Sequence, residues 1–219
     1  MTAEEAEGPP RVTAIRRRTE GPAVLITSDG ETRIVHAEAL ELAGIREGDI
    51  LDHKAQKQLD LDRYRKTARN AALRMLSRRP RSEKEMREHL RQKRLPADVV
   101  EEEVERLKGA GLLDDEAFAH AWVGDRQESS PRGQRLLRHE LLGRGVRAEI
   151  ADAAVSSVDD GTAALAVARG RAPRLAGLEY RKFSQRLAGF LERRGFGYAE
   201  VETAVRTVWN ENAEASERR

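Results

Sequence analysis

Apolar residues recur along this chain in one pattern that occurs three times, about fifty residues apart. In each copy two apolar positions lie four residues apart, a third lies five further on, and a run at helical spacing follows. The copies are Met86, Leu90, Leu95, Val100, Val104 and Leu107, then Leu137, Leu141, Val146, Ile150, Ala154 and Val158, and finally Leu187, Leu191, Phe196, Val201, Val205 and Val208. Each copy predicts two short amphipathic helices joined by a tight turn. The repeat therefore predicts stacked helical units that function through a long surface.

The repeat also predicts which side chains occupy equivalent places. We expect equivalent buried positions for two sets of residues: Leu90, Leu141 and Leu191, and Val104, Ala154 and Val205. The turns are less uniform, because Gly145 and Gly195 stand where the first copy has Arg94. A residue other than glycine that adopts the left-handed conformation after a helix destabilises the fold by on the order of 1 kcal/mol. We therefore expect the turn at Arg94 to be built differently.

The part of the chain before the repeats predicts a small β-meander with one helix. We expect strands over 12–18, 23–27 and 32–35, a turn at 19–22, a two-residue hairpin turn at Asp29-Gly30, a helix over 37–43 that ends at Gly44, and a turn at 46–49. The acidic stretch 1–10 is expected to be disordered.

The repeats themselves predict three helices each. In the first repeat we expect a helix over 54–77, a second that begins at the capping box Ser82-x-x-Glu85, and a third from Pro96 to Lys108. In the second repeat the first helix begins with a cap at Asp114 or Asp115. The other helices are expected near 132–143, 147–158, 162–170, 180–193 and 198–210. The fold class is mainly α: a disordered tail (1–10), a β-containing segment (11–53), three helical repeats (54–111, 112–158, 159–210) and a frayed tail (211–219).

Composition narrows the class of protein. Apolar residues make up 39% and aromatic residues 4%, values typical of thin helical layers exposed on two faces. The chain has no cysteine, which excludes a disulfide framework and a Cys nucleophile. Neither a signal peptide nor a long apolar stretch is present, so we expect a cytoplasmic protein without a membrane partner.

Charge is strongly segregated although the formal net charge is only +2. Residues 63–94 carry 13 basic and 3 acidic side chains, whereas residues 98–117 carry 2 basic and 8 acidic side chains. This alternation predicts distinct positive and negative surfaces and therefore charged partners.

The familiar motifs of enzymes are missing from the sequence. There is no phosphate loop, dinucleotide fingerprint, zinc-protease motif or nucleophile elbow, so we expect no catalytic residue, metal or cofactor. The five histidines are scattered and are interpreted as solvated or packing residues: His36, His53, His89, His120 and His139. We interpret Asp114-Asp115 as a helix cap rather than a metal or acid–base pair. Trp122 shares a face with Phe118, which favours core packing over base stacking.

A three-helix unit also allows a helix-turn-helix interpretation, but the charges oppose it. The last helix of the first unit has five acidic residues and one basic residue over 97–107, and phosphate would repel it. The middle helices are instead basic and could contact a nucleic-acid backbone without reading base sequence, through Arg132, Arg135 and Arg138 and through Arg181, Lys182 and Arg186. The alternative interpretation of each of these residues is that it simply lies on a solvent-exposed face and contacts no partner.

At the level of motifs, the sequence resembles the RecX family of bacterial regulatory proteins. The resemblance is carried by residues 81–90, by 111–119 followed by Trp122-Val123, Arg126 and Gly133, and by 141–146. It is strong over 63–158 and weaker over 159–210, where spacing rather than identity carries it.

This resemblance implies three tandem three-helix repeats in an elongated array and a non-catalytic, monomeric modulator of the RecA recombinase. Family members bind the RecA–single-stranded DNA filament and suppress strand exchange, ATP turnover and co-protease activity. The resemblance transfers no contact residues, because its motif positions are mostly core positions. From charge alone we expect Glu101, Glu102 and Glu105 to meet basic recombinase surfaces. Two alternatives are a sequence-tolerant DNA-binding protein without a recombinase partner and a purely protein-binding helical scaffold.

Overall fold

The computed structural model describes residues 9–17 and 22–217 and is 65% helical. Residues 1–8 of the tail expected over 1–10, and most of the expected turn at 19–22, lie outside the described residues. Pro10, which was expected to be disordered, instead accepts from the Leu51 N–H at 2.8 Å. The described chain forms two compact units, one from 1–75 with 90–105 and the other from 76–89 with 106–219. The boundary passes through the helix that carries Met86, and each unit is described by itself.

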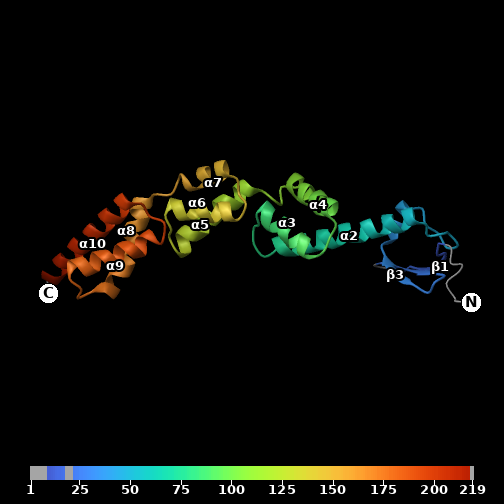
Figure 1. Cartoon of the computed structure of the whole chain (residues 1–219), viewed down its shortest axis with the longest axis horizontal. Helices are drawn as coiled ribbons and strands as arrows, with labels where there is room; N and C mark the ends of the chain where they lie inside the picture. The colour runs from blue at the N-terminus through green and yellow to red at the C-terminus, as the bar shows by residue number, and fades with distance from the viewer. Residues whose placement is uncertain (1–8, 18–21, 218–219) are drawn as a thin grey trace, which may run out of the picture. The chain divides into compact units, whose positions relative to one another are not determined.

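The first unit begins with the expected antiparallel meander of β1 (Val12–Arg16), β2 (Ala23–Thr27) and β3 (Thr32–Val35) (Figure 1). The expected two-residue turn at Asp29-Gly30 is wrong. The N–H of Gly30 donates to the Thr27 carbonyl (2.9 Å) and the Thr27 N–H to the Glu31 carbonyl (3.0 Å), which makes a three-residue loop. Its last residue, Gly30, has φ +82°, as a type I turn followed by a bulge requires.

A short helix and the start of a long one complete this unit's core. Helix α1 (Ala37–Leu42) ends before Gly44, and the turn at 46–49 forms as expected. Helix α2 (His53–Leu76) matches the expected long helix. The buried core contains Val12, Ala23, Leu25, Val35, Ala39, Leu40, Ile45, Leu51 and Leu59.

The turn between α3 (Glu83–Gln92) and α4 (Ala97–Gly109) corrects the expectation for Arg94. Arg94 itself adopts the left-handed conformation with φ +57°, as Gly145 does with φ +83° and Gly195 with φ +88°. The Arg94 N–H donates to the Arg91 carbonyl (2.9 Å), and its side chain is exposed. The turn therefore has the same left-handed conformation as the turns at Gly145 and Gly195, but with an arginine where glycine is favoured.

The second unit contains two further three-helix arrangements, each around its own core. Their helices are α5 (Asp115–Ser129), α6 (Gln134–Gly143) and α7 (Ala148–Val155), then α8 (Asp160–Arg171), the short 3-10 helix η1 (Ala172–Leu175), α9 (Tyr180–Glu192) and α10 (Tyr198–Glu217). The predicted equivalences are confirmed. Leu90, Leu141 and Leu191 are fully buried, and Val104, Ala154 and Val205 are at most 5% exposed.

Several helix boundaries differ from the expected ones; α7, expected to 158, ends at Val155, and α8, expected from 162, begins at Asp160. Helix α6 begins at Gln134 rather than at 132, because Pro131 and the extended Gly133 (φ −71°, ψ 156°) hold the preceding residues out of the helix. Helix α10 continues to Glu217 although fraying was expected from 211. A bidentate ion pair from Arg169 to Glu211 (3.1 and 2.6 Å) ties this extension to α8. Within the described ranges, no helix combines the length and apolar character that crossing a membrane requires.

Candidate functional site

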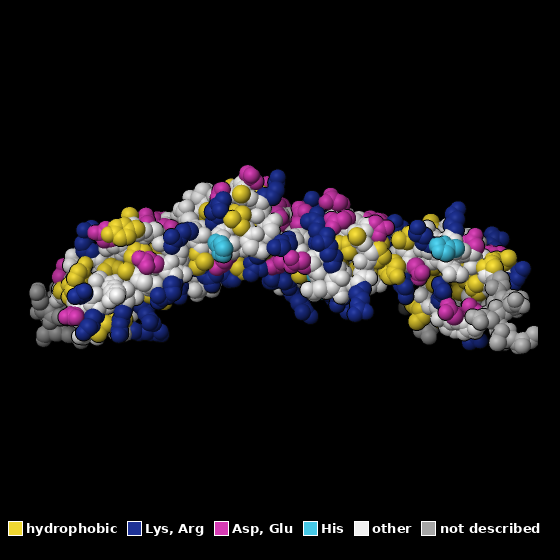
Figure 2. All heavy atoms as spheres, viewed as in Figure 1, with side chains coloured by type: hydrophobic (Ala, Val, Ile, Leu, Met, Phe, Trp, Pro, Cys, Tyr) yellow, Lys and Arg dark blue, Asp and Glu magenta, His cyan; other side chains and the backbone are white. Residues whose placement is uncertain are grey.

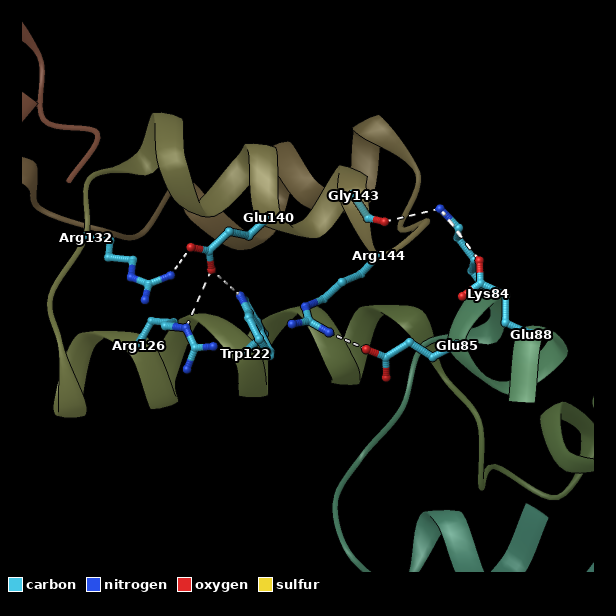
Figure 3. Close-up of a pocket in the computed structure, with 9 residues that line it drawn as sticks. All are labelled: Lys84, Glu85, Glu88, Trp122, Arg126, Arg132, Glu140, Gly143 and Arg144. Carbon is cyan, nitrogen blue, oxygen red and sulfur yellow. Dashed lines mark hydrogen bonds and ion pairs between the residues drawn. The ribbon is translucent and has the colours of Figure 1, made fainter. Parts of the chain in front are cut away.

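Trp122 on α5 lies at the centre of a cluster of charged side chains (Figure 3). Its ring packs against the core of α5–α7 and stacks on Phe118 at 6.1 Å, so the expected core packing is correct for part of the ring. The indole N–H donates to Glu140 Oε2 on α6 at 2.9 Å. Such a bond satisfies the polar end of a half-buried indole and fixes its orientation.

Two guanidinium groups lie against this ring. Cζ of Arg126 is 3.9 Å and Cζ of Arg144 is 3.6 Å from the ring centroid, and Figure 3 shows the two side chains on either side of Trp122. Arg126 comes from the next turn of α5, and Arg144 from the turn after α6. A cation over an indole face is stabilised by about 0.5–2 kcal/mol, depending on desolvation. Trp122 therefore orients both arginines.

Two carboxylates, Glu140 and Glu85, form ion pairs with the arginines around Trp122. Glu140 accepts from Arg132 and lies 3.5 Å from Nε of Arg126. Glu85 pairs with Arg144 and also with Arg79 (3.2 Å) and Arg81 (3.7 Å). The Glu85 side chain therefore does not form its half of the expected capping box, whereas the other half forms: the Glu85 N–H donates to Ser82 Oγ at 3.2 Å.

The cluster carries more positive than negative charge. Among the described residues, five guanidinium groups meet three carboxylates here: Glu85, Glu140 and the more exposed Asp125, which accepts from Arg126 at 2.8 Å. All of these side chains except Asp125 are between 15% and 40% exposed. Burial lowers the pKa of Arg81 and of Arg132 below the ordinary value, and neighbouring arginines lower it further. A recess of about 540 Å³ opens beside Arg126, Arg132 and Arg144, and Lys84 and Glu88 also line it (Figure 3). This arrangement suits an anion.

The same recess lies at a junction that occurs twice in the second unit. The Arg144 carbonyl accepts from Ser82 Oγ (2.7 Å) before α3, and the Arg194 carbonyl accepts from the Gly133 N–H (2.9 Å) before α6. The turn of each later repeat therefore docks on the start of the middle helix of the repeat before it.

Paired aspartates complete both junctions. Asp114 caps α5 with bonds from the N–H groups of Glu116 (2.8 Å) and Ala117 (3.2 Å), which confirms the predicted cap. Asp115 instead accepts from the Glu83 N–H (2.9 Å) at the start of α3. The pair Asp159-Asp160 repeats this: Asp159 caps α8, and Asp160 accepts from the Gln134 N–H (2.9 Å). Burial raises the pKa of both Asp115 and Asp160.

The close approach at these junctions explains the two glycines. A Cβ added at Gly195 would lie 2.7 Å from the backbone nitrogen of Leu136, and one at Gly145 would meet the Lys84 side chain. Both glycines also have positive φ, so conformation and contact each require them.

The structure separates the three arginines that the sequence placed on one middle helix. Arg132 precedes α6 and belongs to the Trp122 cluster. Arg135 donates to the Glu192 carbonyl (3.4 Å), and Arg138 pairs with Asp152 on α7. Arg135 and Arg138 line another recess, of about 480 Å³, which Arg132 does not line. The prediction that all three lie on one middle helix is therefore wrong for Arg132.

The other two predicted groups stay on their helices. Arg181, Lys182 and Arg186 are exposed on α9, and Lys182 lies 3.5 Å from Glu179. In Figure 2, Lys and Arg side chains gather along the lower edge of the region where Figure 1 places α9. On α4, Glu101 pairs with Arg91 (3.3 Å) and Glu102 with Arg65 (2.9 Å), while Glu105 is exposed.

Sequence reasoning missed the residues that surround Trp122. Arg126, Arg144, Glu85 and Glu140 come from α5, from the turn after α6, from α3 and from α6, and no linear spacing brings them together. The repeated Arg-Gly at the two turns is a visible signal, but by itself it predicts only a turn. Among the described residues, no group of three His, Asp or Glu side chains could hold a metal ion.

Comparison with known proteins gives one consistent result. Family models for the first, second and third three-helix domains of RecX match residues 68–107, 114–155 and 159–205. The chain is 38% identical over 155 residues to the regulatory protein RecX of Streptomyces coelicolor, which covers 68% of this chain and 81% of that protein. It is 34% identical over 131 residues to the protein of the same name from Chlorobium phaeobacteroides, covering 60% and 86%.

Solved structures share the fold. A crystal structure of regulatory protein RecX aligns with a TM-score of 0.70 at 21% identity, over 89% of this chain and 98% of that chain. The crystal structure of RecX from Lactobacillus salivarius aligns with a TM-score of 0.61 at 24% identity, over 66% and 96%.

Proposed function

The chain belongs to the RecX family, and from this premise we propose that it is a non-catalytic regulator of the RecA recombinase. It binds RecA and RecA–single-stranded DNA filaments in the cytoplasm and inhibits strand exchange, ATP turnover and co-protease function in DNA repair and the SOS response. The observation that carries this proposal is the match of all three domain models in chain order, with relatives named as regulatory proteins at 31–38% identity.

Features of the surface support a filament as the partner. A filament presents protein and nucleic acid together, and this chain offers exposed cations on α9 and an acidic α4. Contacts of arginine and lysine with phosphate are weak individually and sensitive to salt, so we propose that free single-stranded DNA binds weakly. The protein acts as a monomer along the filament.

The ATPase of preformed RecA filaments on single-stranded DNA tests the proposal. With this protein in excess over filament subunits, ATP turnover falls, and the protein alone hydrolyses no ATP and cleaves no DNA. Unchanged turnover and unchanged strand exchange would overturn the proposed function for this chain.

A second candidate is a sequence-tolerant DNA-binding protein that acts without a recombinase. The excess of guanidinium groups around Trp122 favours it. Equal effects on filaments and on bare single-stranded DNA at matched salt would support this candidate, whereas an effect that requires RecA supports the first.

A further inference from the structure

The recess beside Trp122 offers guanidinium hydrogen-bond donors from three arginines that line it. Within the described chain, Arg132 and Arg144 each bond one carboxylate through a single nitrogen, so most of the five N–H donors of each guanidinium stay available. Arg126 donates to Asp125 Oδ2 through Nη1 (2.8 Å), while its buried Nε lies 3.5 Å from Glu140 Oε2 and makes no hydrogen bond among the described residues. Partly buried cations in excess are costly unless an anion joins them.

We propose that this recess binds a backbone phosphate of single-stranded nucleic acid through the guanidinium groups of Arg126, Arg132 and Arg144. The identity of the nucleic acid rests on the proposed function, whereas the phosphate chemistry rests on the geometry of the recess. Trp122 is a positioning residue, because Cζ of Arg126 and Cζ of Arg144 both lie within 4 Å of its ring centroid. Each of these guanidinium groups bonds one carboxylate through Nη1, Asp125 for Arg126 and Glu85 for Arg144, which leaves further N–H groups for a ligand.

The geometry favours phosphate over a nucleobase. Both guanidinium groups lie within 4 Å of the indole centroid, so a base that stacked on Trp122 would first have to displace one of them. Binding is therefore independent of base sequence. A tetrahedral phosphate can accept from three separate guanidinium groups, whereas a planar carboxylate is satisfied by one fork. Glu85 already accepts such a fork from Arg79, whereas Glu140 accepts single bonds from Arg132 and from the Trp122 N–H.

Occupation of the recess also bears on the junction of the repeats. Arg144 bonds Glu85 at the start of α3 while it stacks on Trp122 of α5. A phosphate that shares Arg144 competes with Glu85 and changes the surroundings of Trp122. The indole thus reports on the site directly.

The experiment uses the whole chain with Trp209→Phe, because the sequence has only two tryptophans and Trp122 is then the sole indole. Oligo(dT) is titrated while Trp122 emission is followed, and poly(dA), tripolyphosphate and poly(Glu) are titrated separately. We expect saturable changes of similar size with oligo(dT) and poly(dA). Binding of tripolyphosphate or poly(Glu) without binding of either oligonucleotide would identify another ligand and overturn the proposal.

Variants then test the residues, with anisotropy of labelled oligo(dT) as the readout and circular dichroism as the check on folding. Arg132→Gln weakens binding about tenfold and makes the salt slope shallower by about 0.7, because one phosphate is no longer neutralised. Arg206→Gln, an exposed change of equal charge on α10, is the matched control. Arg132→Lys keeps the charge but loses the fork, and falls between the two. Equal binding by Arg132→Gln and Arg206→Gln would overturn the proposal.

The positioning role has its own test. Trp122→Phe keeps an aromatic face and retains most of the affinity, whereas Trp122→Leu loses about tenfold at unchanged helix content. If both variants bind like the parent, Trp122 does not position the donors. ATPase inhibition is measured in parallel on the parent: inhibition without phosphate binding overturns this inference alone, and phosphate binding without inhibition overturns the proposed function alone.

Discussion

Asp115 and Asp160 occupy equivalent places in consecutive repeats, since each carboxylate accepts a hydrogen bond from the first N–H of a helix in the preceding repeat. Each follows an aspartate that caps its own helix. Adjacent aspartates therefore serve two helices at once: the first accepts from the unpaired donors of its own helix, and the second from those of its neighbour. Hydrogen bonds from backbone N–H groups to aspartate side chains therefore join consecutive repeats.

This junction predicts a specific response to substitution. Asp160→Ala leaves the Gln134 N–H without its acceptor and lowers the free energy of unfolding by about 0.5–2 kcal/mol. Asp160→Asn keeps an oxygen acceptor and loses less. Urea denaturation at neutral pH measures both, and an equal loss for the two variants would contradict a hydrogen-bonding role.

The same carboxyl gives a prediction for pH. Burial raises the pKa of Asp160 above its ordinary 3.8, so its contribution to stability is fully present below 3.8 and is lost as the pH rises through the higher folded value. Asn cannot ionise and shows no such loss. The stability of Asp160→Asn relative to the parent therefore rises as the pH goes from below 3.8 toward neutrality. Denaturation curves across that window check it; a difference that is flat or falls with pH would show the opposite linkage.

The core of the second repeat predicts a large cost for truncation. Leu141 is fully buried, and Leu141→Ala lowers the free energy of unfolding by about 2–5 kcal/mol because a cavity remains. Leu112 is 49% exposed, so Leu112→Ala is the matched control and changes stability by less than about 0.5 kcal/mol. Thermal and urea denaturation compare the pair, and similar losses would mean that Leu141 is not a core residue.

The docking turns allow backbone strain to be separated from contact. Gly177 has φ +78° with open space where a Cβ would lie, whereas Gly195 has φ +88° and a close backbone neighbour at Leu136. Gly177→Ala thus costs about 1 kcal/mol from conformation alone. Gly195→Ala costs more, because it also pushes α9 and α10 away from α6. Equal losses of stability in urea would indicate that the approach at Gly195 relaxes freely.

Charge reversal on α9 tests the proposed nucleic-acid surface. Changing Arg181, Lys182 and Arg186 to Glu leaves the fold intact, since all three are exposed, and weakens filament binding. The salt slope becomes shallower by about 0.7 for each phosphate that is no longer neutralised. Binding to filaments at several salt concentrations gives the slope. An unchanged affinity and slope would mean that these residues form only a solvated surface.

Reversal on α4 tests the proposed recombinase surface. Changing Glu101, Glu102 and Glu105 to Lys breaks the exposed ion pairs of Glu101 with Arg91 and of Glu102 with Arg65, each of which stabilises the fold by at most about 1 kcal/mol. Binding of free single-stranded DNA is retained or raised, while inhibition of RecA ATP turnover is impaired. The same three positions changed to Gln remove charge without reversing it and show a smaller effect. Full inhibition by the Lys variant would exclude this surface.

A feature of the fold can be predicted from the sequence when the residues that cause it lie close together in the chain. The positions of Leu90, Leu141 and Leu191 follow from helical periodicity, and the cap at Asp114 follows from its place before an apolar run. Arg94 shows the limit of this reasoning. Local sterics make its left-handed conformation unfavourable, but whether the fold tolerates that cost depends on the surrounding packing.

The candidate site was less predictable, for a related reason. The sequence alone determined three helical repeats, their cores and the surplus of cations on the middle helices, because these properties follow from neighbours a few residues apart. Only the tertiary structure decided that Arg132 leaves its helix for Glu140, and that Arg144 meets Trp122 and Glu85, 22 and 59 residues away in the chain. The ion pairs and ring contacts that gather these side chains depend on distance in space, which periodicity along the chain does not encode.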